Sequence, residues 1–492
     1  MYIIHVASEC APVAKVGGLA DVVSGLSWET AIRGHEVEII LPKYDCMRSD
    51  QVWGMTPTMG DLWVPWYGGA IHCTVWFGFV NGRKCFFIEP HSNDNFFNRR
   101  TYYGCSDDVM RYAFFCKAAL EFMLKSGKRP DVIHCHDWQT GLLPVMLAEI
   151  YQHHGLWAQR VCYTIHNFKH QGVFGHDVLA ATGLCRPEYY YRPQQLRDDH
   201  NQAVLNCMKG GIVYSNFVTT VSPNHAWEAR FTDQGYGLGS TLHTHQGKFG
   251  GILNGVDYST WNPEIDHFLP AKYSVDTIEE KYRNKDALRD RFWLYKSEKP
   301  IIGFVGRLDE QKGLNLIYHA AHHALRRGAQ FVLLGSPSNH AIFNQFARLR
   351  AELGQSVDCH IELGFNEELS HLIYAGADMM IVPSAFEPCG LAQLIALRYG
   401  TIPIVRAVGG LADTVFDKDH SHADLSIRNG YTFNNLDQPG IESAMNRAIG
   451  LYYDYPKDFR KLIQNAMNAD YSWNHPGTHY LNIYEYIRHK QA

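Results

Sequence analysis

The chain has 492 residues, of which 46 % are apolar, and a formal net charge of −5 with no long run of Lys and Arg. This length predicts two domains of roughly 100–200 residues or more, and the charge argues against nucleic acid or an anionic membrane as partner. No basic leader precedes the short apolar start, and no apolar stretch approaches the roughly 20 residues that span a bilayer. Twelve Cys are scattered singly without a C-x-x-C pair. We therefore expect a cytoplasmic protein with reduced thiols, the alternative being a disulfide-bonded one.

The first half begins with a unit typical of parallel sheets. The pattern of apolar residues predicts a strand from Tyr2 to Ser8, a helix from Leu19 to Arg33 and a strand over 37–41. Two further short strands, over 131–134 and 161–166, end in polar residues. Because ligands of open parallel sheets bind beyond the carboxyl ends of strands, these polar residues are candidates for a site.

A second α/β series of the same kind begins after Pro300. We predict a strand over 301–305, a loop over 306–313, a helix from Gly313 towards Arg327 and a strand over 330–334. Two more apolar runs, 379–383 and 402–405, continue the series. We place the boundary near 254–257, which gives an N-terminal domain over 1–256 and a C-terminal domain over 257–469. The remaining segment, 470–492, carries Trp473, Tyr480, Ile483, Tyr484 and Ile487 at helical spacing.

One internal echo supports two related halves. Residues 16–23 read VGGLADVV and residues 408–415 read VGGLADTV, so seven of eight positions match. Both copies follow an apolar segment and open a helical pattern. The echo favours a repeated strand-to-helix turn, one in each half.

Two loops carry residues suited to an anion. Gly17 and Gly18 stand where a strand turns into a helix, where backbone amides and the helix dipole favour negative charge, and Lys15 adds a cation. Arg307 and Lys312, five residues apart, are able to converge on a diphosphate. The alternatives are a tight turn with a solvated Lys and an exposed cation pair. The absence of G-x-G-x-x-G from the first turn argues against a nicotinamide enzyme.

A third candidate follows the run 379–383. We expect Pro388 and Gly390 to start a helix, which leaves Glu387 at its N-terminal edge. A carboxylate there accepts hydrogen bonds from sugar hydroxyls, or serves only as a helix cap.

Histidines end two predicted strands of the first half. The segments 134–138 and 166–167 contain metal-ligating residue types, and so does the stretch 417–424. None of these three segments supplies a complete set of metal ligands at a known spacing, so we predict no metal.

Seven short motifs follow one another along the chain. They are KVGGLADV at 15–22, HDW at 136–138, TIHN at 164–167, NGVD at 254–257, GRLDEQKG at 306–313, FEPCGL at 386–391 and GGLADT at 409–414. In this order they resemble the bacterial glycogen synthase and plant starch synthase family, retaining glucosyltransferases of the GT-B architecture. Segments 44–47 and 90–97 are most similar to a cyanobacterial branch related to plant soluble starch synthases.

The resemblance implies two Rossmann-like parallel-sheet domains facing a central cleft, with the C-terminal helix crossing back onto the acceptor-side domain. It implies catalytic roles for Glu387, His166, Asp137, Arg307 and Lys312. It implies donor contacts from Lys15, Gly17, Gly18, Asp21, Asn254, Arg307, Lys312, Glu387, Cys389, Gly390 and Leu391. It implies acceptor contacts from Asp137, Trp138, His166 and Asn167. Many related enzymes carry a second Glu eight positions after the first, where this chain has Ile395, with Gln393 nearby.

The activity that the resemblance implies is transfer of glucose from ADP-glucose to the non-reducing end of an α-1,4-glucan or maltooligosaccharide, without cofactor or metal. Three alternatives stay open: UDP-glucose as donor, another retaining GT-B reaction such as that of a sucrose synthase or a trehalose-type transferase, and a non-catalytic glucan-binding homologue. Retention is compatible with front-face displacement or with a double displacement that needs a protein nucleophile, and the residues do not choose between them.

Overall fold

The computed structural model describes residues 1–157 and 159–489, and the chain divides into two compact units. One unit comprises Met1–Gly255 together with the C-terminal segment from Trp473, and the other comprises Val256–Ser472. Of the predicted terminal segment 470–492, residues 490–492 lie outside the described residues. Within the described residues no helix is both long and apolar enough to cross a membrane. The cytoplasmic location stays a prediction.

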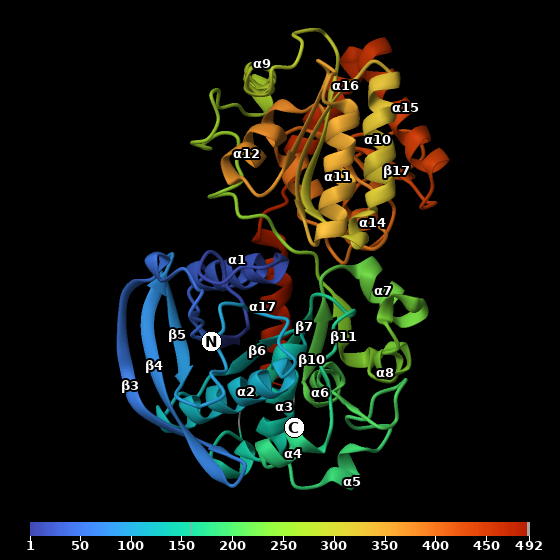
Figure 1. Ribbon diagram of the computed structural model, residues 1–492. Helices are drawn as coiled ribbons and strands as arrows, with labels where there is room; N and C mark the ends of the chain where they lie inside the picture. The colour runs from blue at the N-terminus through green and yellow to red at the C-terminus, as the bar shows by residue number, and fades with distance from the viewer. Residues whose placement is uncertain (158, 490–492) are drawn as a thin grey trace. The chain divides into compact units, whose positions relative to one another are not determined.

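The first unit is built on a nine-stranded sheet in the order β11-β10-β7-β6-β1-β2-β5-β4-β3 (Figure 1). All neighbouring strands run parallel except β3–β4 and β4–β5, which are antiparallel. The strands are β1 (Tyr2–Val6), β2 (Glu36–Pro42), β3 (Trp53–Trp66), β4 (Gly69–Val80), β5 (Arg83–Pro90), β6 (Val132–His136), β7 (Arg160–Ile165), β10 (Phe217–Thr220) and β11 (Phe249–Gly251). A separate antiparallel pair joins β8 (Val173–Phe174) to β9 (Leu205–Asn206).

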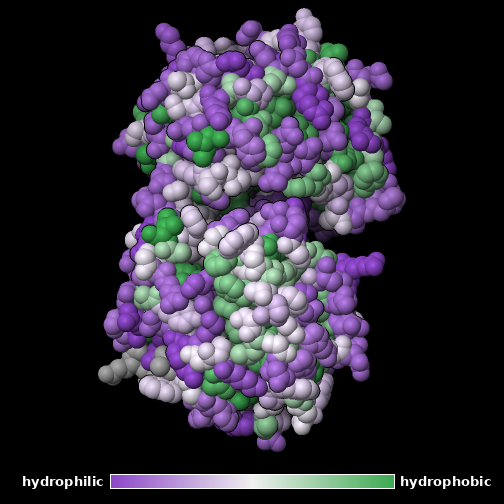
Figure 2. Space-filling model, turned by 90° about the vertical axis from the view of Figure 1, so that its left-hand side faces the viewer, coloured by the Kyte–Doolittle hydropathy of each residue, from purple (hydrophilic) through white to green (hydrophobic). Residues whose placement is uncertain are grey.

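The long β3–β4 hairpin was not anticipated from the sequence. β3 contains Pro57 and Pro65, and proline is tolerated in a sheet chiefly on an edge strand, which β3 is. Its exposed face carries Trp53 and Trp63, which are 76 % and 49 % exposed. Residues of low polarity gather on this side of the unit (Figure 2). Some of the chain's aromatic residues, which make up 13 % of the sequence, therefore lie at the surface rather than in the core.

Helices cover both faces of the first sheet. They are α1 (Gly18–Ile32), α2 (Asp108–Lys125), α3 (Leu142–Glu149), α4 (His176–Thr182), α5 (Pro187–Tyr190), α6 (Cys207–Tyr214), α7 (Pro223–Phe231), α8 (Gly239–Thr244) and α17 (Asn474–His489). The terminal segment forms α17, which packs against α1 and β7 of this unit. Tyr480, Tyr484 and Ile487 are fully buried there, and burying large apolar side chains is the main stabilisation of such a helix.

The second unit is a six-stranded, wholly parallel sheet in the order β14-β13-β12-β15-β16-β17. Its strands are β12 (Ile301–Leu308), β13 (Gln330–Pro337), β14 (Cys359–Leu363), β15 (Met379–Val382), β16 (Ile402–Arg406) and β17 (Tyr431–Phe433). Its helices are α9 (Lys281–Phe292), α10 (Leu314–Arg326), α11 (His340–Leu353), α12 (Glu367–Gly376), α13 (Ala392–Arg398), α14 (Gly409–Thr414), α15 (Gln438–Asp454) and α16 (Pro456–Asn468).

Two sequence-based expectations for this unit are wrong in detail. Strand β12 continues to Leu308, so Arg307 lies on the strand and not in the loop, because the register with β13 runs through Leu308 and Pro337. No helix begins at Pro388 or Gly390. Helix α13 begins at Ala392, because Gly390 has a φ of +75°, which a right-handed helix does not accommodate.

Each sheet has one point at which successive strands are added on opposite sides. In the first unit β1 lies between β2 and β6, and in the second β12 lies between β13 and β15. Loops diverge at the carboxyl ends of such neighbouring strands and leave a place where ligands bind. These two ends are where the predicted site residues have to be sought.

Candidate active site

The glycine loop of the first unit, residues 7–17 between β1 and α1, is organised by a residue that the sequence analysis did not single out. The carboxylate of Glu9, three residues beyond β1, accepts hydrogen bonds from the backbone amides of Val16 (2.6 Å) and Gly17 (3.0 Å). Its other oxygen accepts from the Tyr103 hydroxyl at 2.6 Å. Burial raises the pKa of Glu9, while these three hydrogen bonds act to lower it. The amide of Gly17, expected to face an anion, is therefore engaged by a carboxylate of the protein itself.

Of the other predicted residues of this loop, Lys15 and Gly18 are exposed. Gly17 is extended (φ −147°, ψ −165°) and precedes α1, and added Cβ atoms at Gly17 or Gly18 would meet nothing within 4 Å. Lys15 lies on the surface with its Nζ 2.7 Å from the Asp21 carboxylate, and its side chain is half exposed. The loop thus leaves open space beside a cation and beside the N-terminus of a 15-residue helix, a combination suited to an anionic group.

The ends of β6 and β7 are tied together through Asp137. This residue has φ 56° and ψ −179°, a conformation that only Gly adopts readily. Its buried carboxylate accepts the backbone N–H of His166 at 2.6 Å and that of Asn167 at 3.4 Å. Burial raises the pKa of Asp137 to about 7. Backbone strain held in place by hydrogen bonds from the next strand is characteristic of functional positions.

Trp138 and Asn167 complete this edge of the sheet. The Trp138 ring meets Tyr112 edge-on at 5.6 Å, and Gly172 lies so close to it that a Cβ there would overlap the indole. The side chain of Asn167 accepts the backbone N–H of Lys169 at 3.0 Å. Of the predicted acceptor residues, the structure therefore brings Asp137, His166 and Asn167 into direct contact and holds Trp138 beside them by packing.

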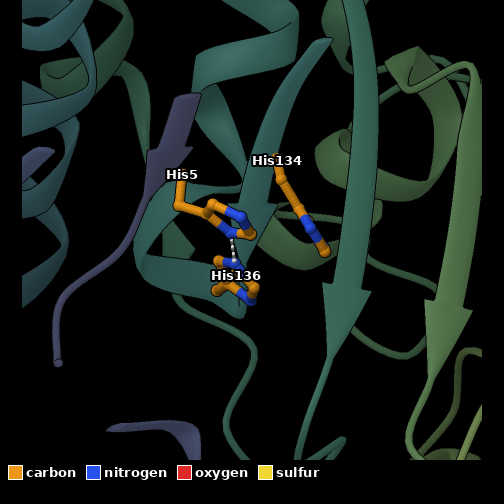
Figure 3. A group of neighbouring side chains, drawn as sticks. All are labelled: His5, His134 and His136. Carbon is orange, nitrogen blue, oxygen red and sulfur yellow. Dashed lines mark hydrogen bonds between the residues drawn. The ribbon is translucent and has the colours of Figure 1, made fainter. Parts of the chain in front are cut away.

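Behind His166 lies a group of buried histidines. His166 Nε2 is 3.1 Å from His136 Nδ1, and His136 Nε2 is 3.1 Å from His5 Nδ1 (Figure 3). His134 is bonded separately, to the Tyr484 hydroxyl at 2.7 Å and to Thr164 Oγ1 at 2.6 Å.

Two groups of residues in the described chain bring together atoms able to ligate a metal. His5, His134 and His136 form one, but the rings of His134 and His136 stack at 4.1 Å and their nitrogens are engaged in hydrogen bonds. His319 and His323, one turn apart on α10, form the other with Glu442 of α15, whose carboxylate lies 2.7 Å and 3.2 Å from them. The second group has ligand types and helical spacing that suit zinc better.

In the second unit one buried carboxylate dominates the switch point, the place beside β12 where successive strands are added on opposite sides. Glu387 Oε2 lies 2.5 Å from Lys312 Nζ and accepts the Ser384 hydroxyl at 2.8 Å. The loop that carries Lys312 is fixed against the end of β15, because Ala385 N donates to Gln311 O at 2.8 Å and a Cβ on Gly313 would overlap the Pro383 carbonyl. Arg307 is half exposed, 3.4 Å from Asp309. The structure thus pairs Lys312 with Glu387, whereas Arg307 is paired with Asp309.

The segment after Glu387 packs against the second copy of the repeated octapeptide. Gly410 N donates to the Glu387 carbonyl at 3.0 Å, and a Cβ on Gly409 (φ +46°) would overlap that same oxygen. Gln393 Nε2 donates to the carbonyls of Cys389 and Gly390 at 3.0 and 2.9 Å. These bonds replace the helical turn that the sequence predicted here.

The other predicted donor residues are divided between the two units. Cys389 is buried and Leu391 is the N-cap of α13, both next to Gly390 in the second unit. Asn254 is buried in the first unit. It lies three residues after β11 and next to Gly255, where the segment Met1–Gly255 of this unit ends.

Comparison with known proteins identifies the family. A family model described as the starch synthase catalytic domain matches residues 2–244, and one described as glycosyl transferases group 1 matches residues 288–467. The chain is 64 % identical over 486 residues to "Glycogen synthase 2" of Methylococcus capsulatus, covering 99 % of this chain and 100 % of the relative. It is 62 % identical over 491 residues to "Glycogen synthase 1" of a Synechococcus species, covering 100 % of both.

The chain belongs to the glycogen and starch synthase family. Among solved structures it matches the catalytic domain of starch synthase IV from Arabidopsis thaliana bound to ADP and acarbose, with a TM-score of 0.96, 42 % identity and 99 % of each chain covered. The predicted family, the two Rossmann-like domains of the GT-B fold and the glycosyltransferase activity in glucan synthesis are therefore confirmed.

Proposed function

We propose that the protein transfers glucose from ADP-glucose to the non-reducing end of an α-1,4-glucan with retention of the anomeric configuration. The observation that carries the proposal is the buried Glu387 carboxylate, bonded to Lys312 and Ser384 at the switch point of the second sheet. The starch synthase IV catalytic domain, to which the chain is 42 % identical, was solved with ADP and acarbose. That similarity supports an adenine nucleotide donor and an α-glucan acceptor.

The donor side consists of cations and one carboxylate. Breaking the bond between glucose and the nucleotide leaves negative charge on the diphosphate, which prearranged cations stabilise. Lys312 is bonded to Glu387. On donor binding, Lys312 turns to the diphosphate together with Arg307, and Glu387 accepts hydrogen bonds from hydroxyls of the transferred glucose. Lys15 and the open space beside Gly17 and Gly18 receive a further part of the donor.

The acceptor side consists of Asp137, His166, Asn167 and Trp138. Asp137 and His166 line the transferred glucose and the acceptor sugar. The acceptor hydroxyl attacks the anomeric carbon on the face that the diphosphate leaves, and its proton passes to a leaving phosphate oxygen. Excluding water during this step limits hydrolysis of the donor. The double-displacement alternative requires a protein carboxylate beneath the anomeric carbon.

The test is glucose transfer to maltooligosaccharides from ADP-glucose and, separately, from UDP-glucose, with and without a chelator. We expect ladder extension from ADP-glucose that the chelator does not abolish. Lys15→Ala should weaken this extension, whereas Lys296→Ala, which removes an equally short exposed pair with Asp290, should not.

Other outcomes contradict the proposal in distinct ways. Extension from UDP-glucose alone would overturn the choice of donor, and transfer only to fructose or to a sugar phosphate would overturn the acceptor. Glucan binding without transfer from either donor would favour a non-catalytic glucan-binding protein.

A further inference from the structure

Three histidines from three neighbouring strands form a continuous hydrogen-bonded row. His5 lies on β1, His136 ends β6 and His166 follows β7, and the two bonds that join them are each 3.1 Å long. Figure 3 shows the first of these bonds, between His5 and His136, with His134 standing beside the pair. The row runs from the interior of the first unit to His166, whose backbone N–H is held by Asp137.

All three imidazoles are neutral at physiological pH. Burial lowers the pKa of His5 and of His166 to about 3, and it lowers the pKa of His136 well below its ordinary value. A neutral imidazole has one N–H and one lone pair, so each of the two bonds needs a donor on one side and an acceptor on the other. The protonation of the three rings is therefore coupled, and the row has only two arrangements.

The inner end of the row distinguishes the two arrangements. His5 Nε2 is buried and, among the described residues, has no hydrogen-bond partner. If the bonds point inward, this atom carries an N–H with no acceptor, and a buried N–H without a partner is rare in proteins. If they point outward, it carries only a lone pair. The outward arrangement, in which His5 Nδ1–H donates to His136 and His136 Nδ1–H donates to His166 Nε2, is therefore favoured.

We propose that His5 and His136 are positioning residues that hold His166 in its Nδ1–H tautomer. His166 then offers a fixed N–H donor to a sugar hydroxyl oxygen and does not accept a hydrogen bond from the substrate. This inference deepens the proposed function and rests on it for the contact between His166 and the sugar. Among the described residues, no protein group is bonded to His166 Nδ1, which leaves that atom for the ligand.

The direct test is two-bond ¹⁵N–¹H correlation NMR of histidine-labelled, substrate-free protein, with the His166 signal assigned by its loss in His166→Gln. We expect His166 to be protonated at Nδ1 in the wild type. In His5→Asp the inner donor is replaced by a carboxylate that accepts the His136 Nε2–H, which reverses the row, so we expect His166 to be protonated at Nε2. His5→Asn places an amide N–H near the position of the imidazole Nδ1, and we expect it to keep the Nδ1–H tautomer of the wild type.

The kinetic arm uses the same variants. We expect His5→Asp to lower kcat about tenfold, the value of one ordinary hydrogen bond, with little change in KM, and His5→Asn to keep a kcat close to that of the wild type. Tyr484→Phe is the matched control, because it removes a bond to His134 in the same buried group and leaves the row intact.

Two results would overturn the inference. One is a wild-type His166 protonated at Nε2, which is measurable even if a variant fails to fold. The other is an unchanged Nδ1–H tautomer in folded His5→Asp. Because the spectra need no substrate, a protein that transfers no glucose would still answer this question, so failure of the proposed function is distinguishable from failure of the inference.

Discussion

The two copies of the repeated octapeptide are used in opposite ways. In the first unit Gly17 and Gly18 border open space, and added Cβ atoms would meet nothing within 4 Å. In the second unit Gly409 and Gly410 lie against the backbone of the Glu387 segment, where added Cβ atoms would overlap carbonyl oxygens. Both pairs precede or begin a helix. The first pair thus leaves room for a ligand, whereas the second leaves room for the protein's own chain.

The difference teaches that a glycine pair at a strand-to-helix turn has no single meaning. The first pair borders open space directly, and its loop is held by hydrogen bonds from the backbone amides of Val16 and Gly17 to the Glu9 carboxylate. The second pair positions Glu387 through close packing and the bond from Gly410 N. Substitutions in the first should change binding, and substitutions in the second should change folding as well.

The largest expected effect is in the second copy. Gly409→Ala forces a left-handed residue to carry a Cβ into the Glu387 carbonyl, so we expect a loss of about 2–4 kcal/mol in the free energy of unfolding, measured by urea denaturation. Transfer activity should fall with it, because the Glu387 segment has to move. A Gly409→Ala protein as stable and active as the wild type would show that this packing is not what holds Glu387.

The pH dependence of stability tests whether burial raises the pKa of the Asp137 carboxyl in the first unit. The pKa of Asp137, about 7, lies above its ordinary value of 3.8, so the folded chain keeps a proton that the unfolded chain releases between these values. The stability from this proton is complete below pH 3.8 and is lost as the pH rises towards 7. Relative to Asp137→Asn, the wild type should lose up to about 4 kcal/mol over this window.

Urea denaturation of both proteins at several pH values measures this difference directly. A parallel pH dependence in wild type and Asp137→Asn would mean that the Asp137 carboxyl titrates as an ordinary exposed one does.

A smaller effect is expected from Gly17→Ala. Its backbone is extended and its surroundings are open, so the free energy of unfolding should change by no more than about 0.5 kcal/mol. If the loop contacts the donor, the added methyl group should raise the KM for ADP-glucose. Unchanged steady-state kinetics in this variant would remove the loop from the donor site.

The smallest effect on stability is expected from Lys15→Ala. Its pair with Asp21 is half exposed, and exposed pairs of this kind contribute about 0–1 kcal/mol. We expect thermal unfolding to match that of Lys296→Ala while only Lys15→Ala loses affinity for the donor. Equal kinetics in the two variants would make Lys15 an ordinary surface residue.

Much of the fold could be predicted because the sequence carries local signals for it. The short apolar runs that became β1, β6 and β7 end at polar residues, and Tyr480, Tyr484 and Ile487 have the spacing of a buried helix face. The β3–β4 hairpin was not predicted because Pro57 and Pro65 contradict an ordinary strand pattern and are tolerated only at a sheet edge.

The candidate site was predictable as a set of residues but not as a set of contacts. Motif order pointed to Lys312 and Glu387, yet only the folded chain brings them together from different loops. Glu9 was missed although it closely follows β1, where the strand-end rule directs attention. The non-helical turn at Gly390 depends on the side chain of Gln393, a contact that no local pattern encodes.

The most direct test of the account is transfer of glucose from ADP-glucose to maltooligosaccharides by Glu387→Gln, compared with Glu264→Gln, a change at an exposed carboxylate of the same unit. We predict that Glu387→Gln folds, binds glucan and extends the ladder at least about 100-fold more slowly than the wild type, whereas Glu264→Gln keeps wild-type rates. A folded Glu387→Gln protein that extends the ladder at the wild-type rate would contradict the assignment of Glu387 to the transferred glucose.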